Sequence, residues 1–155
     1  MATLLVPVII KKGSKSSRLR GFLDTGAELT MISSTHAQKL GLPKKGKGYM
    51  VGAGGRFTFW GAKVSDIQIP GTRCSSGPMM VAVYDERAFP MGGLTGFSAI
   101  IGFDFMRKTR MNIAAAAKTG AVSCARRLAD LLDGPALGLE TSVGGLLSIT
   151  EAVVV

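Results

Sequence analysis

The sequence predicts an all-β chain, because short apolar segments alternate with glycine-rich turns along most of its length. Its hydrophobic content is 46%, with 21 glycines and only 6% aromatic residues, which is typical of a compact, turn-rich globule. Segments such as TLLVPVII (residues 3–10) are apolar and rich in β-branched side chains. No apolar run approaches the roughly 20 residues of a membrane-spanning helix, so we expect no membrane contact.

The first half of the chain predicts two hairpins with a short helix between them. Residues 3–10 and 18–24 flank a turn-like stretch and predict the first hairpin. Residues 34–42 (STHAQKLGL) predict a helix, with Ser34 or Thr35 as its N-cap and Gly41 as its stop. Residues 47–64 place a glycine cluster between two strands, which predicts the second hairpin.

The second half predicts further strands and one short C-terminal helix. Residues 64–69 and 77–84 predict strands, 86–96 a loop, and 98–101 (SAII) a short buried strand. Residues 102–109 (GFDFMRKT) predict the helix, and residues 111–124 predict a last hairpin that turns at Lys118, Thr119 and Gly120. At 155 residues, the chain fits one domain with a tail.

The composition changes at Arg126, so we place a domain at residues 1–125 and a tail or polyprotein linker at 126–155. Residues 126–134 (RRLADLLDG) can form a helix, and the rest of the tail is apolar and rich in glycine. We expect the tail to be dispensable for catalysis. The alternative is that residues 126–134 dock as a helix and the final AVVV pairs as an edge strand.

The net charge of +9 is distributed unevenly. Residues 126–155 carry two arginines against four acids, so the first 125 residues hold +11. Basic groups lie at residues 11–20, 44–47 and 107–110. They indicate either solvated loops and edges or a weak contact with nucleic acid. No aromatic residues interleave with them in the sequence as in a base-stacking platform.

The cysteine and histidine content excludes several site classes. His36 is the only histidine, and Cys74 and Cys124 stand 50 residues apart, so neither an ordinary zinc site nor a histidine-based triad can form. Two cysteines also fall short of a disulfide framework, and a reducing compartment is the simpler expectation. We expect no cofactor and no metal.

The segment GFLDTGAELTMIS (residues 21–33) places a single carboxylate, Asp24, at the end of an apolar strand. Burying an acid there is costly unless another group hydrogen-bonds it or shares its charge. Two facing carboxylates that share a proton can activate water and hydrolyse a peptide bond without metal, Ser or Cys. Gly26 permits a tight turn, Thr25 offers a hydroxyl, and Ala27 leaves room for a substrate backbone. Asp-Thr-Gly also occurs as an ordinary turn.

Three segments in order resemble the retropepsins, the retroviral-type aspartic proteases. Residues 22–33 are similar to their active-site strand, 48–69 to their glycine-tipped flap and following strand, and 98–113 to their Ile-Ile-Gly strand and C-terminal helix. The resemblance covers roughly residues 4–125. It implies a closed-barrel acid protease fold that carries half a site, since Asp-Thr-Gly occurs once and the second carboxylate must come from a homodimer mate.

The resemblance also implies roles for further residues. Asp24 is the catalytic acid, Thr25 from both chains braces the base of the site, and Gly26 completes the catalytic motif. Ala27 and Glu28 contact the substrate backbone. The flap tip is formed by Gly52, Ala53, Gly54 and Gly55. The side-chain pockets are lined by Phe97, Ser98 and Ile100.

The sequence departs from the family pattern at Phe103, where many retropepsins have an arginine that pairs with an acid. The matching acid is Glu28, for which Arg20 or Arg107 is a candidate partner. Asp104 is expected to accept backbone N–H groups at a helix start rather than to catalyse.

The sequence therefore predicts a homodimeric aspartic endopeptidase that processes a polyprotein in the cytoplasm or in a virion or virus-like particle. The alternative is a non-catalytic dimeric module on the same fold that binds peptide or nucleic acid.

Overall fold

The computed structural model describes residues 4–52, 55–87, 96–115, 119–127 and 151–154. Two short helices, α1 (Ser34–Lys39) and α2 (Phe103–Thr109), accompany the strands. The strands are β1 (Leu5–Lys12), β2 (Lys15–Leu23), β3 (Met31–Ser33), β4 (Lys45–Gly52), β5 (Gly55–Val64), β6 (Asp66–Gln68), β7 (Met79–Tyr84), β8 (Ala99–Ile101), β9 (Met111–Ala115), β10 (Thr119–Cys124) and β11 (Glu151–Val154). The all-β prediction is confirmed.

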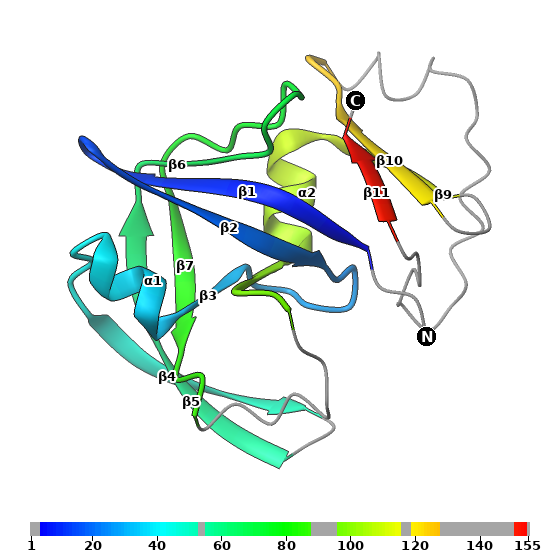
Figure 1. Ribbon diagram of the computed structural model, residues 1–155. Helices are drawn as coiled ribbons and strands as arrows, with labels where there is room; N and C mark the ends of the chain where they lie inside the picture. Colours follow the sequence, from blue (N-terminus) through cyan, green and yellow to red (C-terminus); the bar gives the residue numbers. More distant parts are fainter. Residues whose placement is uncertain (1–3, 53–54, 88–95, 116–118, 128–150, 155) are drawn as a thin grey trace.

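The strands form two sheets. Eight of them follow the order β4-β5-β7-β3-β8-β2-β1-β6, and the other three follow the order β11-β10-β9. In Figure 1 the β1–β2 hairpin crosses the upper part of the molecule, β4 and β5 lie at the bottom, and the three-stranded sheet lies at the right. The larger sheet runs from β4 to β6, and its closure into a barrel stays a prediction.

The three predicted hairpins are present. β1 pairs with β2 from Leu5↔Phe22 to Lys12↔Lys15, β4 pairs with β5 up to Gly52↔Gly55, and β9 pairs with β10. Part of the predicted last turn, at residue 118, lies outside the described residues, whereas Thr119 and Gly120 belong to β10.

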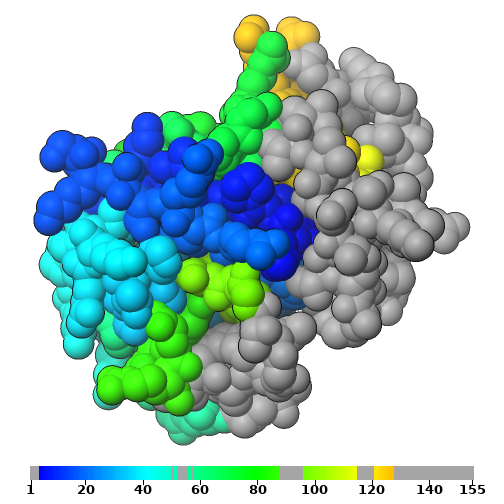
Figure 2. Space-filling view, viewed as in Figure 1, coloured from blue at the N-terminus to red at the C-terminus, as the bar shows by residue number. Residues whose placement is uncertain are grey.

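The core follows from alternation along the strands. On β1 the side chains of Val6, Val8 and Ile10 are buried, with more exposed residues between them, as expected for a strand with one face against a core. These three side chains belong to the larger of two hydrophobic clusters, which also contains Phe105 of α2. A smaller second cluster consists of Phe22, Met31, Ala82, Tyr84 and Ile100. In Figure 2, β1 and β2 (blue) cover the upper left of the visible face, next to α1 (cyan).

The N-cap of helix α1 precedes both predicted caps. Its N-cap is Ser33, whose hydroxyl accepts from the His36 backbone N–H at 3.4 Å. Ser34 and Thr35, the predicted caps, are inside the helix, because β3 ends at Ser33 and leads directly into it. Gly41 follows the helix in the left-handed region (φ 64°), as expected for a helix stop.

The two cysteines form a disulfide, a bond that the sequence pattern does not predict. Cys74 lies between β6 and β7, Cys124 ends β10, and their Cα atoms are 5.2 Å apart. The fold brings together positions separated by 50 residues, which their spacing in the sequence does not indicate. The bond fastens the smaller sheet to the larger one.

The final strand lies at an edge, as in the alternative considered for the tail. β11 pairs with β10 in parallel, from Thr119↔Glu151 to Val122↔Val154. The predicted helix at residues 126–134 lies almost entirely outside the described residues. Within the described part of the chain, no helix is long and apolar enough to cross a membrane.

Candidate active site

The central strands fix the position of Asp24, which directly follows β2. β8 pairs with β2 in parallel and with β3 in antiparallel orientation, so the segment between β2 and β3 begins and ends beside β8. The backbone N–H of Asp24 donates to the Ile101 carbonyl at 3.0 Å, immediately beyond the last pair of the ladder. The sheet therefore fixes the backbone position of this half-buried acid.

The Asp-Thr-Gly motif forms a tight turn around the Asp24 carboxylate. Gly26 donates its backbone N–H to Asp24 Oδ1 at 2.9 Å, and Ala27 donates to the Asp24 carbonyl at 3.2 Å. A Cβ on residue 26 would lie 3.2 Å from Asp24 Oδ1, which is a crowded contact. Glycine at this position lets the backbone N–H approach the carboxylate, as the sequence predicts.

The segment after this turn is fastened to the start of α2. Phe103 donates its backbone N–H to the Ala27 carbonyl at 2.7 Å, and Asp104 donates to the Glu28 carbonyl at 3.3 Å. Gly102 packs so closely that a Cβ there would lie 2.6 Å from the Leu29 carbonyl carbon. Backbone hydrogen bonds and close packing thus hold the segment after the acidic turn against the start of α2.

Asp104 acts at the helix start, as predicted. Its carboxylate accepts from the Phe105 backbone N–H and from both the backbone and the hydroxyl of Thr30. The Thr30 hydroxyl in turn accepts from the Gly102 N–H at 3.1 Å. The Asp104 carboxylate therefore has a structural role, because its hydrogen bonds join Thr30 to α2.

Glu28 does not pair with either predicted arginine. Among the described residues, the one ion pair joins Arg87 to Asp85, and Glu28 is exposed. Arg107 instead lies over the Phe103 ring, 5.5 Å from its centroid. The Arg107 guanidinium thus contacts the aromatic ring at position 103 and not the Glu28 carboxylate.

A groove of about 430 Å³ lies between the acidic turn and the β4–β5 hairpin. It brings together three of the predicted residues, Gly26, Ala27 and Glu28. Its remaining lining residues, which the motif comparison missed, are Leu29, Tyr49, Val51 and Phe59. The alternation of Tyr49 and Val51 on β4 is the sequence signal for a shared face there.

The groove exposes apolar side chains to solvent. Leu29 is 39% exposed, Tyr49 60% and Val51 76%, all large values for hydrophobic residues. The Arg56 guanidinium lies over the Tyr49 ring at 3.8 Å and covers one of its faces. Exposed apolar surface in a concave site is suited to binding an apolar or peptide ligand.

The predicted pocket residues lie mostly in the second cluster rather than in the groove. Ile100 is only 5% exposed, and Phe97 stacks on Phe22 with ring centroids 5.4 Å apart. Ser98 joins neighbouring segments, donating to Arg20 and accepting from Ser33 through its backbone. This cluster meets the groove through Ala27 and Phe59, which pack against its edge.

The hairpin tip is partly described. Gly52 ends β4 and pairs with Gly55, which begins β5, whereas Ala53 and Gly54 lie outside the described residues. In the described part of the chain, no three His, Cys, Asp or Glu side chains gather as a metal site would require.

An Asp-Thr-Gly turn next to a groove that a β-hairpin borders is the arrangement expected of an aspartic peptidase. Residues 6–105 match the aspartyl protease family, and the chain belongs to this family. A comparison with curated proteins gives no match.

Solved structures that are similar to the chain include the following three. EIAV protease complexed with the inhibitor HBY-793 is 23% identical over 66% of this chain and 84% of that one, with a TM-score of 0.45. The retroviral protease-like domain of Ddi1 from Leishmania major is 18% identical over 72% and 81%, with a TM-score of 0.46. A retropepsin-like aspartic protease from Rickettsia conorii is 14% identical over 72% and 75%, with a TM-score of 0.48.

Proposed function

We propose that the protein is an endopeptidase that acts as a homodimer, with the Asp24 carboxylates of two copies facing each other. The observation that carries this proposal is that one Asp-Thr-Gly turn per chain holds one carboxylate, and that Gly26, which donates to this carboxylate, lines a groove with exposed apolar side chains. A single carboxylate cannot act as both the base and the acid of peptide hydrolysis at the same moment. Two-fold symmetry supplies the second one without a second motif.

The paired carboxylates divide the chemistry between them. Two like charges so close together cannot both ionise, so they share one proton. The ionised carboxylate takes a proton from water as the water oxygen attacks the scissile carbonyl carbon, and the protonated one donates to the carbonyl oxygen. When the C–N bond breaks, the carboxyl that took the water proton donates it to the leaving nitrogen, and the other carboxylate takes back the proton of an intermediate hydroxyl as the carbonyl reforms. The pair again holds one proton.

Exposed apolar side chains near the acidic turn support a second copy as partner. Leu29, in the segment after Asp24, is 39% exposed. Phe103, whose backbone N–H donates to the Ala27 carbonyl, is 48% exposed. A mate that places its own Asp24 opposite would cover such surface. β9 is the outer strand of the three-stranded sheet and offers an edge for pairing with that mate. Thr25 of both chains would brace the base of the dimer.

The β4–β5 hairpin is proposed as the flap that closes over a polypeptide substrate. Its tip contains Gly52, Ala53, Gly54 and Gly55. An extended substrate can lie as an added strand between the hairpin and residues 26–29. The apolar lining favours bonds flanked by hydrophobic residues, with Phe97, Ser98 and Ile100 shaping the pockets from behind. We propose a polyprotein as the substrate, in the cytoplasm or in a virus-like particle.

The test is mass spectrometry of a peptide library incubated with the purified full chain at mildly acid pH. We expect new cleavage products that pepstatin suppresses and that Asp24→Asn abolishes, because Asn keeps the size of the side chain but cannot share the proton. Circular dichroism and sedimentation of Asp24→Asn should match the unaltered protein. A folded, dimeric wild-type protein that cleaves no peptide would instead indicate a non-catalytic binding module, and appreciable turnover by Asp24→Asn would exclude the aspartic mechanism.

A further inference from the structure

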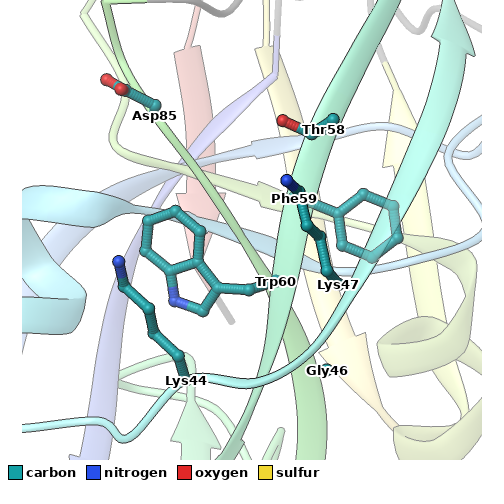
Figure 3. Close-up of a pocket in the computed structure, with 7 residues that line it drawn as sticks. All are labelled: Lys44, Gly46, Lys47, Thr58, Phe59, Trp60 and Asp85. Carbon is teal, nitrogen blue, oxygen red and sulfur yellow. The ribbon is translucent and has the colours of Figure 1, made fainter.

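A second hollow, of about 380 Å³, lies beside the β4–β5 hairpin and differs from the groove in its charge. Its lining residues are Lys44, Gly46, Lys47, Thr58, Phe59, Trp60 and Asp85. Figure 3 shows Lys44 running along the Trp60 ring, with Asp85 on the far side of that ring and Lys47 beside Phe59. The hollow therefore combines two ammonium groups with two aromatic rings.

A β-bulge at Gly46 lies between the two lysines in the sequence. Lys45 pairs with Gly61 and Lys47 with Trp60, so Gly46 is an extra residue on β4. Lys44 directly precedes β4, Lys47 follows the bulge, and both line the hollow. Gly46 has a φ of 69°, in the left-handed region that favours glycine.

On the paired strand β5, a glycine lies opposite the residue before the bulge, since Gly61 pairs with Lys45. A Cβ on Gly61 would lie 2.7 Å from the Lys45 carbonyl oxygen, so only glycine fits there without a shift of the backbone. Neighbouring Trp60 is thus held directly opposite Lys47. Lys44 Nζ lies 4.4 Å from the Trp60 ring centroid, a cation–π contact that restricts its position.

The acid at the rim is already neutralised by another residue. Asp85 accepts from the Arg87 backbone N–H at 3.0 Å and pairs with the Arg87 guanidinium at 3.3 Å. The backbone hydrogen bond, followed by the side-chain bond, lowers the pKa of Asp85. Since Arg87 compensates this charge, Lys44 and Lys47 leave the hollow net positive.

We propose that this hollow binds an acidic segment of a polypeptide, with its carboxylates at Lys44 and Lys47 and its apolar atoms against Trp60 and Phe59. The identification of that polypeptide as a substrate, bound outside the bond being cleaved, rests on the proposed function. A peptide fits better than a nucleic acid, because Lys44 already covers a Trp60 face on which a base would stack. Asp85 can also accept a peptide N–H, a donor that the sugar-phosphate backbone of a nucleic acid lacks.

Phe59 links this acidic-segment site to the groove, because it lines both hollows. Its ring lies over Gly48, where a Cβ would be 2.6 Å from the Phe59 ring. A ligand that packs against Phe59 on one side therefore contacts a residue that borders the substrate on the other. Occupancy of the site should favour cleavage of a peptide whose acidic segment lies outside the groove.

The direct test uses the single tryptophan of the sequence as a reporter. We expect a capped oligoglutamate peptide, added to the full-length Asp24→Asn protein, to change Trp60 fluorescence with saturation, and an oligoglutamine peptide to cause no change. Calorimetry should show that the double variant Lys44→Gln/Lys47→Gln binds oligoglutamate about tenfold more weakly. The matched control, Lys12→Gln/Lys63→Gln, removes the same charge from residues outside the hollow and should bind normally.

Three results would overturn the proposal: no saturable binding up to roughly millimolar peptide, equal weakening in both double variants, or tighter binding of a single-stranded oligonucleotide of the same charge. The last result would indicate a nucleic-acid surface. Use of Asp24→Asn keeps this outcome separate from catalysis. Cleavage without oligoglutamate binding refutes the acidic-segment site alone, whereas binding to a protein that cleaves no peptide refutes the proposed function alone.

The kinetic test compares a cleaved peptide with the same peptide extended by glutamates. We expect the extension to raise kcat/KM in the wild-type protein and in the control variant. Lys44→Gln/Lys47→Gln should lose this advantage while it cleaves the unextended peptide at the wild-type rate. An advantage that persists in this variant would show that the extension binds elsewhere.

Discussion

Thr30 and Asp104 are joined by two hydrogen bonds across 74 residues of sequence, from the Thr30 backbone N–H at 3.1 Å and from its hydroxyl at 2.7 Å. Thr30 is fully buried, and its hydroxyl also accepts from the Gly102 N–H. The segment that begins at Asp24 is thus fastened at its far end to α2. The position of Asp24 therefore depends on two attachments: its own backbone bond to Ile101 and the bonds between Thr30 and Asp104.

Thr30→Val should lower the free energy of unfolding by about 2–3 kcal/mol, because it leaves the buried Gly102 N–H without its acceptor. Thr30→Ser is the matched control, since it keeps the hydroxyl and loses only a methyl group, worth about 1 kcal/mol. Urea denaturation measures both values. Equal losses in the two variants would show that the hydroxyl contributes little.

Activity per molecule should fall on dilution, because the proposed pair of Asp24 carboxylates disappears with the dimer. Peptide cleavage is measured across protein concentrations alongside sedimentation velocity. The two midpoints should coincide. Constant specific activity at concentrations where the protein sediments as a monomer would refute the shared site.

Removal of the Cys74–Cys124 disulfide should reduce stability by about 4 kcal/mol, the chain-entropy value for a closed loop of 50 residues. The double variant Cys74→Ala/Cys124→Ala is compared with the unaltered protein by urea denaturation, with and without dithiothreitol. Reductant should destabilise the unaltered protein and leave the double variant unchanged. A reductant-insensitive unaltered protein would mean that the bond does not form.

Stability should decline as pH falls below 6.5, in part through His36. Burial and, to a lesser extent, Lys39 lower the pKa of His36 from its ordinary 6.5, while Glu86 opposes them. Because the unfolded chain takes up this proton more readily, the contribution is present above pH 6.5 and is lost as pH falls through the folded value. The single imidazole can be followed by NMR. A midpoint at or above 6.5 would contradict the assignment.

A chain that ends at Ala125 should retain cleavage but unfold at a lower temperature. It keeps all the strands that hold Asp24, whereas β10 loses the pairing with β11. Differential scanning calorimetry and the peptide assay separate the two effects. Loss of the dimer in this shortened chain would place residues 126–155 within the functional fold and contradict the boundary proposed at Ala125.

The predictable features were those encoded locally. The Asp24 turn, the helix-start role of Asp104 and the three hairpins follow from short patterns of glycine, acid and alternating apolar residues. The disulfide, and the fact that neither Arg20 nor Arg107 pairs with Glu28, depend on which distant segments come together in the fold. The spacing of residues in one sequence does not reveal such contacts. The proximity of Lys44 to Trp60 depends on strand register and on the bulge at Gly46, which no local motif announces.

Gly102 illustrates how a position without chemistry can be as constrained as a catalytic one. Any side chain there would overlap the Leu29 backbone, and the overlap could be relieved only by displacing the segment that carries the acid. In a saturation mutagenesis screen scored by activity, residues 24 and 102 would be equally intolerant, and the screen alone would rank a packing contact among the reacting groups. Measuring abundance in parallel would separate them, since variants at position 102 should disappear from the folded pool while Asp24→Asn persists.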